Sequence, residues 1–298
     1  MDLMYILLIV TIVAVVLFDF TNGFHDAADM VATAIASRAM TATVAIILVT
    51  SFTFMAPFMV GLAVADTVGN FVNLEGVETI KAQSIILSGL LAAVSYNLIT
   101  WKFGLPSSSS NSLVGGLVGA TLFGLDNHAI HWGIDALGHG HIEGVMKIVV
   151  GLSLSPIGAF IFGFILMKLF MKLFARLTLK SRKIFIMSQY LSISWLGFSH
   201  GANDAQKGMA IIAMVLLASG ETSSFVVPAW VIVLCASAIS LGTLFGGWSI
   251  IKTLGFGIIK VKTLHSFTDQ IGSALINTLA TAIGAPTSTT QVVTATLL

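Results

Sequence analysis

Five long stretches of this chain carry almost no charged side chain, and they restrict its fold more than any other feature. A helix needs ~20 predominantly apolar residues to cross the hydrocarbon core of a bilayer, and most of the stretches approach that length. Since a backbone in lipid must satisfy its own hydrogen bonds, they predict an all-α protein that crosses a membrane several times. The stretches are residues 3–18, 42–65, 84–101, 145–167 and 225–251.

The composition agrees with a membrane protein and argues against other classes. Charged residues make up 9% of the 298-residue chain, against roughly 25% in a soluble domain. The net charge of +1 gives no sign of a nucleic-acid partner, and the single cysteine, Cys235, permits no internal disulfide. The first apolar stretch follows the acidic Asp2 rather than a basic segment, so we interpret it as a retained membrane helix and not as a secretory signal.

Charged residues are distributed unevenly between the connections, which predicts an orientation. Loop 66–81 holds three acidic residues with only Lys81 for balance, which suits the outside. Connection 168–183 is basic, and the positive-inside rule places it in the cytoplasm. Alternating spans then put the N-terminus outside the plasma (or inner) membrane. The basic residues of that connection are Lys168, Lys172, Arg176, Lys180, Arg182 and Lys183.

A hydroxyl-rich segment occurs twice. GLPSSSSNS at 104–112 and GAPTSTTQV at 284–292 both place four Ser or Thr residues after a proline, followed by a carboxamide, Asn111 or Gln291. Both segments are flanked by apolar sequence, so a surface linker is a poor explanation for them.

A second motif is duplicated at nearly the same distance from the first. TNGFHDAADM at 21–30 aligns with SHGANDAQKGM at 199–209, so that Asp26 matches Asp204. From this aspartate to the proline of the hydroxyl-rich segment there are 80 residues in one half and 82 in the other. Two motifs at equal spacing indicate an internal repeat. Nine residues before the proline, both halves also carry an asparagine, Asn97 or Asn277.

The loop charges predict that the second repeat is inserted upside down. The counterpart of acidic loop 66–81 is segment 252–262, which carries three lysines (Lys252, Lys260 and Lys262) and no acidic residue. Inverted repeats are typical of transporters that bind their substrate near the midplane. We therefore divide the chain into a first repeat, 1–125; an outer loop, membrane helix and basic cytoplasmic loop, 126–183; and a second, inverted repeat, 184–298. The second repeat is the shorter one, and we expect a missing C-terminal segment.

The first motif lies inside a stretch that is long for one helix. Residues 3–36 would span about 51 Å as a straight helix, against a hydrocarbon core of ~30 Å. We therefore expect a helix broken near Asn22 and Gly23, and an equivalent break at Ser199, His200 and Gly201, with free carbonyls at membrane depth.

Buried charges are costly in a membrane, so the paired carboxylates Asp26 and Asp204 are candidates for a functional site. Carboxylate oxygens suit Na⁺. Asp29 and Lys207 occupy matching positions, and an ion pair between the repeats is an alternative explanation for them. His25 and His200 lie beside the aspartates; each is either a satisfied buried histidine or a proton carrier.

The hydroxyl-rich segments are candidates for an anion site. A helix that starts after a proline exposes N–H groups that bind anions, and the hydroxyls add neutral donors. Cations held by the aspartates would offset the charge of the anion, so the two solutes would bind together; a protonated carboxylate could serve instead. Phosphate, which retains a proton to donate to a carboxylate, is favoured over sulfate. The candidate phosphate ligands here are Ser107, Ser108, Ser109, Ser110, Asn111, Thr287, Ser288, Thr289, Thr290 and Gln291.

Together, NGFHDAADMVAT (22–33), HGANDAQKGMA (200–210) and the two hydroxyl-rich segments resemble the inorganic phosphate transporter family, usually called PiT. The resemblance implies cation-coupled symport of inorganic phosphate, an inverted repeat of broken and re-entrant helices, and a homodimer. It adds Asn22 and Asn203 to the phosphate site. Our candidate Na⁺ ligands are Asp26, Asp204, Asn22 and Asn203, which match the family's motif, together with the paired Asn97 and Asn277; Na⁺ is favoured over H⁺. The brief basic connection points to a prokaryotic protein.

Other functions remain open at this point. A sulfate permease of the same fold, an anion channel and a membrane enzyme are the alternatives. The sequence contains no recognisable pair of a nucleophile and a general base, so we expect that the chain is not an enzyme. We expect no cofactor other than Na⁺ as the coupling ion. The best candidates for another metal site are loop histidines, which we interpret as solvated: His128, His131, His139 and His141.

Overall fold

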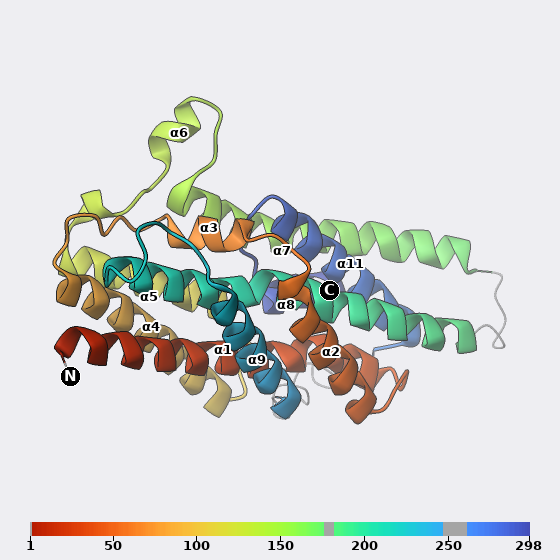
Figure 1. The fold of residues 1–298 in the computed structure, drawn as a ribbon. Helices are drawn as coiled ribbons and strands as arrows, with labels where there is room; N and C mark the ends of the chain where they lie inside the picture. Colours follow the sequence, from red (N-terminus) through yellow and green to blue (C-terminus); the bar gives the residue numbers. More distant parts are fainter. Residues whose placement is uncertain (1, 176–181, 247–260) are drawn as a thin grey trace.

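The computed structural model describes residues 2–175, 182–246 and 261–298, and these residues form helices and connecting turns without a β-strand (Figure 1). The predicted all-α fold is confirmed. The first part of the chain forms α1 (Leu3–Ala36), α2 (Ala42–Met55), η1 (Ala56–Phe58), α3 (Ala63–Gly69), α4 (Thr79–Lys102) and α5 (Ser109–Gly124). After η2 (Asn127–Ala129) and α6 (Ile134–Gly138), the remainder forms α7 (Gly144–Leu173), α8 (Arg182–Ala218), α9 (Ala229–Phe245), α11 (Thr263–Ala282) and α12 (Thr289–Leu297).

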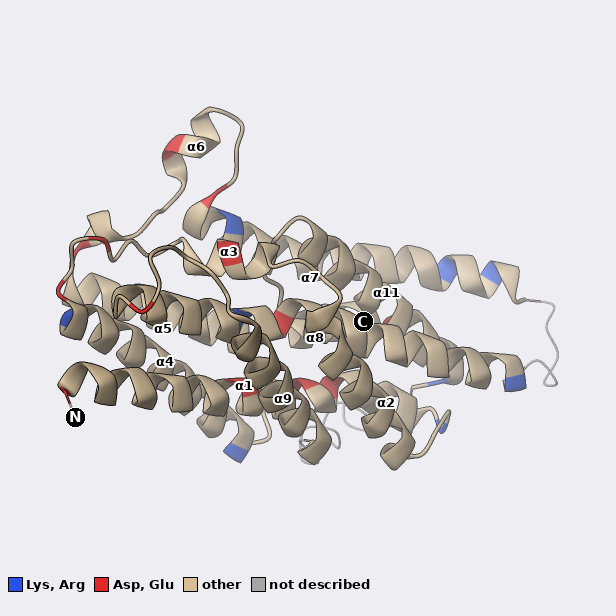
Figure 2. Cartoon of the chain, in the orientation of Figure 1, with Lys and Arg blue, Asp and Glu red and all other residues tan. Residues whose placement is uncertain are grey.

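Three described helices, α1, α4 and α7, are long and apolar enough to cross a membrane. Helices α2 and α3 form a bent pair, with an angle of 76° at a short break, that would make a fourth span. Helix α7 exposes large apolar side chains such as Phe160 and Phe164, as expected of a surface that faces lipid. Most charged residues lie near helix ends or in connections, while a few acidic residues lie in the middle of the bundle (Figure 2).

The expected breaks in the two signature helices are wrong. Helix α1 runs through Asn22 and Gly23 over 34 residues, and α8 runs through the His200–Gly201 step over 37 residues. A break is found instead between α2 and α3. Because the backbone of α1 and α8 stays helical, their carbonyls at this depth are not free to bind cations.

The glycines that suggested those breaks allow helices to cross closely. A Cβ atom added to Gly23 of α1 would lie 2.0 Å from the carbonyl oxygen of Ile239 in α9. One added to Gly201 of α8 would lie 2.2 Å from that of Thr53 in α2. Each signature helix thus touches the backbone of a helix from the opposite half of the chain, a distance that only glycine permits.

The order of elements is the same in the two halves, because α1, α2, α4 and α5 have the counterparts α8, α9, α11 and α12. This order is consistent with the predicted repeat, while the inverted orientation and the domain division remain predictions. Part of the evidence for them, Arg176, Lys180, Lys252 and Lys260, lies outside the described residues. The halves are interleaved: α1 packs on α9 as well as on α4, and α8 packs on α2 as well as on α11.

Candidate functional site

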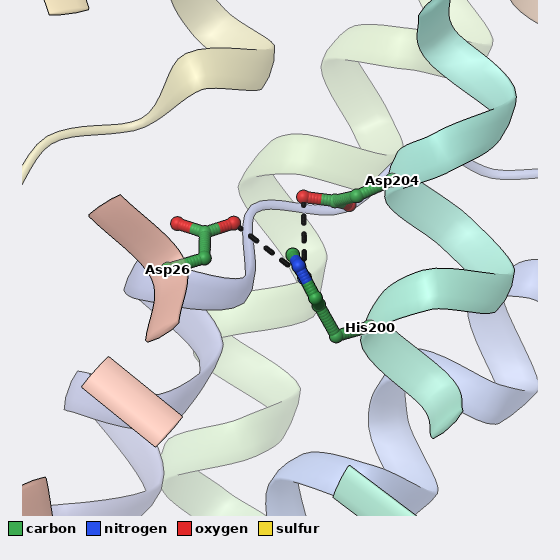
Figure 3. A group of neighbouring side chains, drawn as sticks. All are labelled: Asp26, His200 and Asp204. Atoms are coloured by element: carbon green, nitrogen blue, oxygen red, sulfur yellow. Dashed lines mark ion pairs between the residues drawn. The ribbon is translucent and has the colours of Figure 1, made fainter. Parts of the chain in front are cut away.

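The two signature aspartates meet in the middle of the bundle. Asp26 of α1 and Asp204 of α8 are buried, with exposures of 3% and 1%. His200, also on α8, lies between them: its Nδ1 atom is 3.6 Å from Oδ2 of Asp26 and 3.5 Å from Oδ2 of Asp204 (Figure 3). The ligand atoms of the three residues lie within 4.8 Å of one another, which is compact enough to hold an ion. The sequence allowed His200 to be a satisfied buried histidine or a proton carrier. The structure places it between the two signature carboxylates.

A helix begins inside each hydroxyl-rich segment, as predicted. Ser108 caps α5 by accepting a hydrogen bond from the backbone N–H of Asn111 at 3.1 Å. Ser288 caps α12 in the same way, from the N–H of Gln291 at 3.4 Å. Serine is a favoured residue at this position because its oxygen satisfies an N–H group that the helix itself cannot. We call residues 107–110 and 287–290 the first and second tips.

The tips reach the signature carboxylates. The hydroxyl of Thr290 lies within hydrogen-bond distance of two carboxyl groups and donates its one proton either to Oδ1 of Asp26, 2.9 Å away, or to Asp29. The Thr289 hydroxyl lies 3.2 Å from Nδ1 of His200. The tips also touch each other, because Ser110 donates its hydroxyl to the carbonyl of Thr287 at 2.6 Å. Segments from both halves of the chain therefore converge on one buried cluster.

The ion pair considered between Asp29 and Lys207 is not what the structure shows. The Nζ atom of Lys207 lies 2.5 Å from Oδ1 of Asp204, one helical turn away on α8. It also donates to the hydroxyl of Ser110 at 2.5 Å and to the carbonyl of Thr287 at 2.8 Å. Asp29 instead accepts from Thr290. The reason is geometric: each of these residues faces the tip of the opposite half rather than its own counterpart.

Of the signature asparagines, one touches a carboxylate and one holds a tip. Asn22 donates its amide to Oδ2 of Asp204 at 3.3 Å. Asn203 donates to the Thr281 hydroxyl at 3.0 Å and to the Ala285 carbonyl at 3.1 Å. Its Oδ1 atom accepts from the N–H of Thr287 at 3.0 Å. Asn203 therefore fixes the second tip against α8.

Of the paired asparagines before the prolines, Asn277 contacts a tip, and Asn97 contacts α1 and the first turn of α5. Asn277 accepts from the Thr287 hydroxyl at 3.1 Å. Asn97 accepts from Ser112 at 3.3 Å and donates to Thr21 at 3.4 Å. Neither has a described hydrogen bond to Asp26 or Asp204, so these contacts support a positioning role rather than the expected role as Na⁺ ligands.

The remaining residues of the two hydroxyl-rich segments differ in their surroundings. Ser107 shares a hydrogen bond of 2.8 Å with Thr100. The Ser109 hydroxyl and the side-chain Oε1 atom of Gln291 are buried and have no hydrogen-bond partner among the described residues. Asn111 is exposed, so the expectation that it joins the buried site is not supported.

His25 is held by the carbonyl of Asn97, 2.8 Å from its Nε2 atom. Of the two explanations offered for this residue, this contact favours a satisfied buried histidine. The loop histidines His128, His131, His139 and His141 are exposed, and no metal-binding group was found among them in the described part of the chain. His128 and His131 line an open cavity of about 1020 Å³.

Sequence reasoning missed two buried acidic residues near the site. Asp269 of α11 accepts from the Thr33 hydroxyl at 2.9 Å and from Ser273 at 3.3 Å. Asp19 of α1 is fully buried, and neither of its oxygens has a hydrogen-bond partner among the described residues. The signal was present in both cases, since a carboxylate inside a membrane helix is costly by default.

Comparisons with known proteins identify the family of the chain. A family model described as "Phosphate transporter family" matches residues 22–184 and 175–298. The chain belongs to the phosphate transporter family. It is 38% identical, over 98% of its length and 84% of the relative's, to a "Probable low-affinity inorganic phosphate transporter" of Rhizobium meliloti (strain 1021). It is also 38% identical to a protein of the same description from Bacillus subtilis (strain 168), over 100% of this chain and 86% of that protein.

A solved structure shares the fold of this family member. "The sodium-dependent phosphate transporter" superposes with a TM-score of 0.82 at 23% identity, over 97% of this chain and 88% of that one. At this identity the likeness establishes the fold alone. The resemblance inferred from the motifs is thereby confirmed at the level of the family. The relatives are named as transporters, in agreement with the expectation that the chain is not an enzyme.

Proposed function

We propose that this protein is a secondary active transporter that couples the movement of inorganic phosphate across the cell membrane to Na⁺. One observation carries the proposal. The tips of two hydroxyl-rich helices, from opposite halves of the chain, meet at two buried carboxylates that come from the duplicated signature. Family membership and the names of the relatives support phosphate as the substrate.

The tips supply the anion half of the site. Helices α5 and α12 begin at the tips, and the N–H groups at a helix start attract anions. Hydroxyls such as Ser109 and Thr289 add donors without a permanent charge, which suits a substrate that must be released. In the structure the hydroxyls of Ser110 and Thr290 bond to protein groups. Phosphate binding therefore requires that the substrate replace some of these contacts.

The signature residues supply the cation half. Asp26 and Asp204 offer carboxylate oxygens, and the Oδ1 atom of Asn22 is buried without a partner among the described residues. Hard cations such as Na⁺ take oxygen ligands of this kind. The residues present therefore fit a Na⁺ ion that is carried with the substrate. Asn203 and Asn277 act on this site by holding the second tip, and Asn97 links α4 to α1 and α5.

Coupling follows from the charges. Phosphate beside Asp26 and Asp29 is repelled unless a cation is bound, because charges in a buried site are weakly screened. Conversely, the cation binds more tightly when the anion is present, since linkage between two sites is reciprocal. Phosphate is favoured over sulfate because a protonated phosphate oxygen can donate to a carboxylate, whereas sulfate can only accept. We further expect the protein to form a homodimer, as the resemblance implies, with its N-terminus outside.

The decisive experiment uses purified protein in liposomes. An inward Na⁺ gradient should drive accumulation of labelled phosphate, and excess sulfate should compete poorly. If an imposed proton gradient drives phosphate accumulation and Na⁺ has no effect, the coupling ion is H⁺ and not Na⁺. Anion currents without any cation dependence would show a channel and overturn it.

A further inference from the structure

The two halves of the site are equivalent in position but opposite in charge. Asp29 and Lys207 each lie three residues after a signature aspartate. Ser110 and Thr290 each lie four residues after a proline. Thr290 contacts Asp29, and Ser110 contacts Lys207, so the same two positions meet across the bundle in both halves. At these two positions the signature helix contributes a carboxylate in one half and an ammonium group in the other.

The first half of the site contains an excess of negative charge. The Thr290 hydroxyl bridges Asp26 and Asp29, two carboxylates on one face of α1. In the described part of the chain, Asp29 has no ion pair. Asp26 has one weak ion-pair contact, 3.6 Å between its Oδ2 atom and Nδ1 of His200. The Oδ1 atom of Asp29 is buried and has no hydrogen-bond partner there. This half therefore needs a positive charge or a proton that its own described side chains do not supply.

The second half is already neutral. The Lys207 side chain is 1% exposed, and its Nζ atom is surrounded by a carboxylate, a hydroxyl and a backbone carbonyl at 2.5, 2.5 and 2.8 Å. These are the oxygen types that bind a hard monovalent cation in transporters. An ammonium group with three oxygen partners also satisfies its three donors, so the charge is fully paired.

We propose that the Lys207 ammonium group permanently occupies the cation position of the second half, so that mobile Na⁺ binds only in the first half, at Asp26 and Asp29. The inference rests on the proposed Na⁺ coupling and narrows its cation site, because Asp204 then pairs with the fixed ammonium group instead of binding Na⁺. It also predicts how many ions move. A tethered charge helps to hold phosphate but cannot leave with it. The transporter therefore moves one cation fewer per phosphate than a site with two exchangeable positions.

Removing the ammonium group should convert the fixed cation into a mobile one. Lys207→Ala leaves the oxygens of Asp204, Ser110 and Thr287 without their partner. Because hydrogen bonds to charged groups are among the stronger ones in proteins, phosphate uptake at low Na⁺ should fall at least about tenfold. High Na⁺ should recover much of it, and so should methylammonium, which fits the space that the side chain vacates.

The measurement is the number of Na⁺ ions per phosphate, from paired tracer fluxes in liposomes. The variant should move one Na⁺ more per phosphate than the wild type. Lys183→Met is the matched control, because it removes an exposed charge at the start of the same helix, outside the site. An unchanged ratio in a transporting Lys207→Ala variant, or no response to Na⁺ and methylammonium in a folded one, overturns the inference. If the proposed function itself is wrong, phosphate uptake by the wild-type protein will not depend on Na⁺, which distinguishes that failure from failure of this inference.

A second measurement does not depend on the variant. Thallium(I), a monovalent cation with strong anomalous scattering, can be soaked into crystals of the wild-type protein. We expect an anomalous peak beside Asp26 and Asp29 and none between Ser110 and Thr287. A peak that contacts the Ser110 hydroxyl and the Thr287 carbonyl, with Lys207 displaced, would show an exchangeable position there and overturn the inference.

Discussion

Thr290 donates a hydrogen bond to Asp26 across 264 residues of sequence, with 2.9 Å between the two oxygens. The donor comes from the second tip and the acceptor from the first signature. Neither half of the chain can form this contact alone. The candidate site therefore exists only where the two halves meet, and its residues can be tested in pairs.

Asp26→Asn should abolish Na⁺ dependence and reduce phosphate uptake about 100-fold, because a neutral amide replaces a ligand worth about 3 kcal/mol to a bound cation. The measurement is uptake into liposomes at several Na⁺ concentrations. Asp66→Asn is the control, since Asp66 is exposed on α3. Wild-type Na⁺ dependence in Asp26→Asn would remove this residue from the cation site.

Thr290→Ala should weaken phosphate binding by about tenfold, because a hydroxyl donor to charged groups is lost. Thr290→Ser keeps the hydroxyl and should bind nearly as well as the wild type. Equilibrium binding of labelled phosphate to purified protein separates the two variants. If both lose affinity equally, the methyl group and not the hydroxyl is what the site requires.

Gly23→Ala should destabilise the protein by about 1–3 kcal/mol, because the new methyl group would overlap the carbonyl of Ile239 and push α1 and α9 apart. Gly119→Ala is the matched control: it adds the same methyl group to α5, where nothing lies within 4 Å. The midpoint of thermal unfolding in detergent compares the two. Equal unfolding midpoints for the two variants would mean that α1 and α9 can move apart without loss of stability.

Asp19→Asn should raise the stability of the protein by about 1 kcal/mol or more, because a side chain that is neutral at every pH replaces a buried carboxyl group whose oxygens have no hydrogen-bond partner among the described residues. Thermal unfolding tests this directly, with Asp66→Asn again as the control. A lower midpoint would show that the carboxylate is bound by something that stabilises it. Slower uptake in a more stable variant would instead place Asp19 on the transport path.

The class of fold and the composition of the site were predictable because both depend on local patterns. Long apolar stretches require helices in a membrane, and polar residues inside them are costly enough to mark a site. The duplicated motifs linked Asp26 to Asp204 and the first tip to the second before any contact was known. Their convergence in one cluster is therefore the part of the prediction that the geometry supports best.

The errors concern contacts between residues, which neither local patterns nor an alignment of the repeats shows. Gly23 suggested a break because glycine disfavours helices, yet its role depends on Ile239, which lies far along the chain. Lys207 matched Asp29 in the alignment, but alignment identifies equivalent positions and not contacts; its partner Asp204 is one turn away. Asp269 was overlooked because its partner Thr33 belongs to the other half of the chain.

The crossing of the halves also has a consequence for biosynthesis. The N-terminal part of a chain emerges from the ribosome first, so α1 is made long before Thr290 and Ile239 exist. Until they arrive, Asp26 and Asp29 lack the hydroxyl that binds them, and Gly23 lacks the backbone that it touches. The buried contacts of α1 are therefore completed only after the second half of the chain has been inserted.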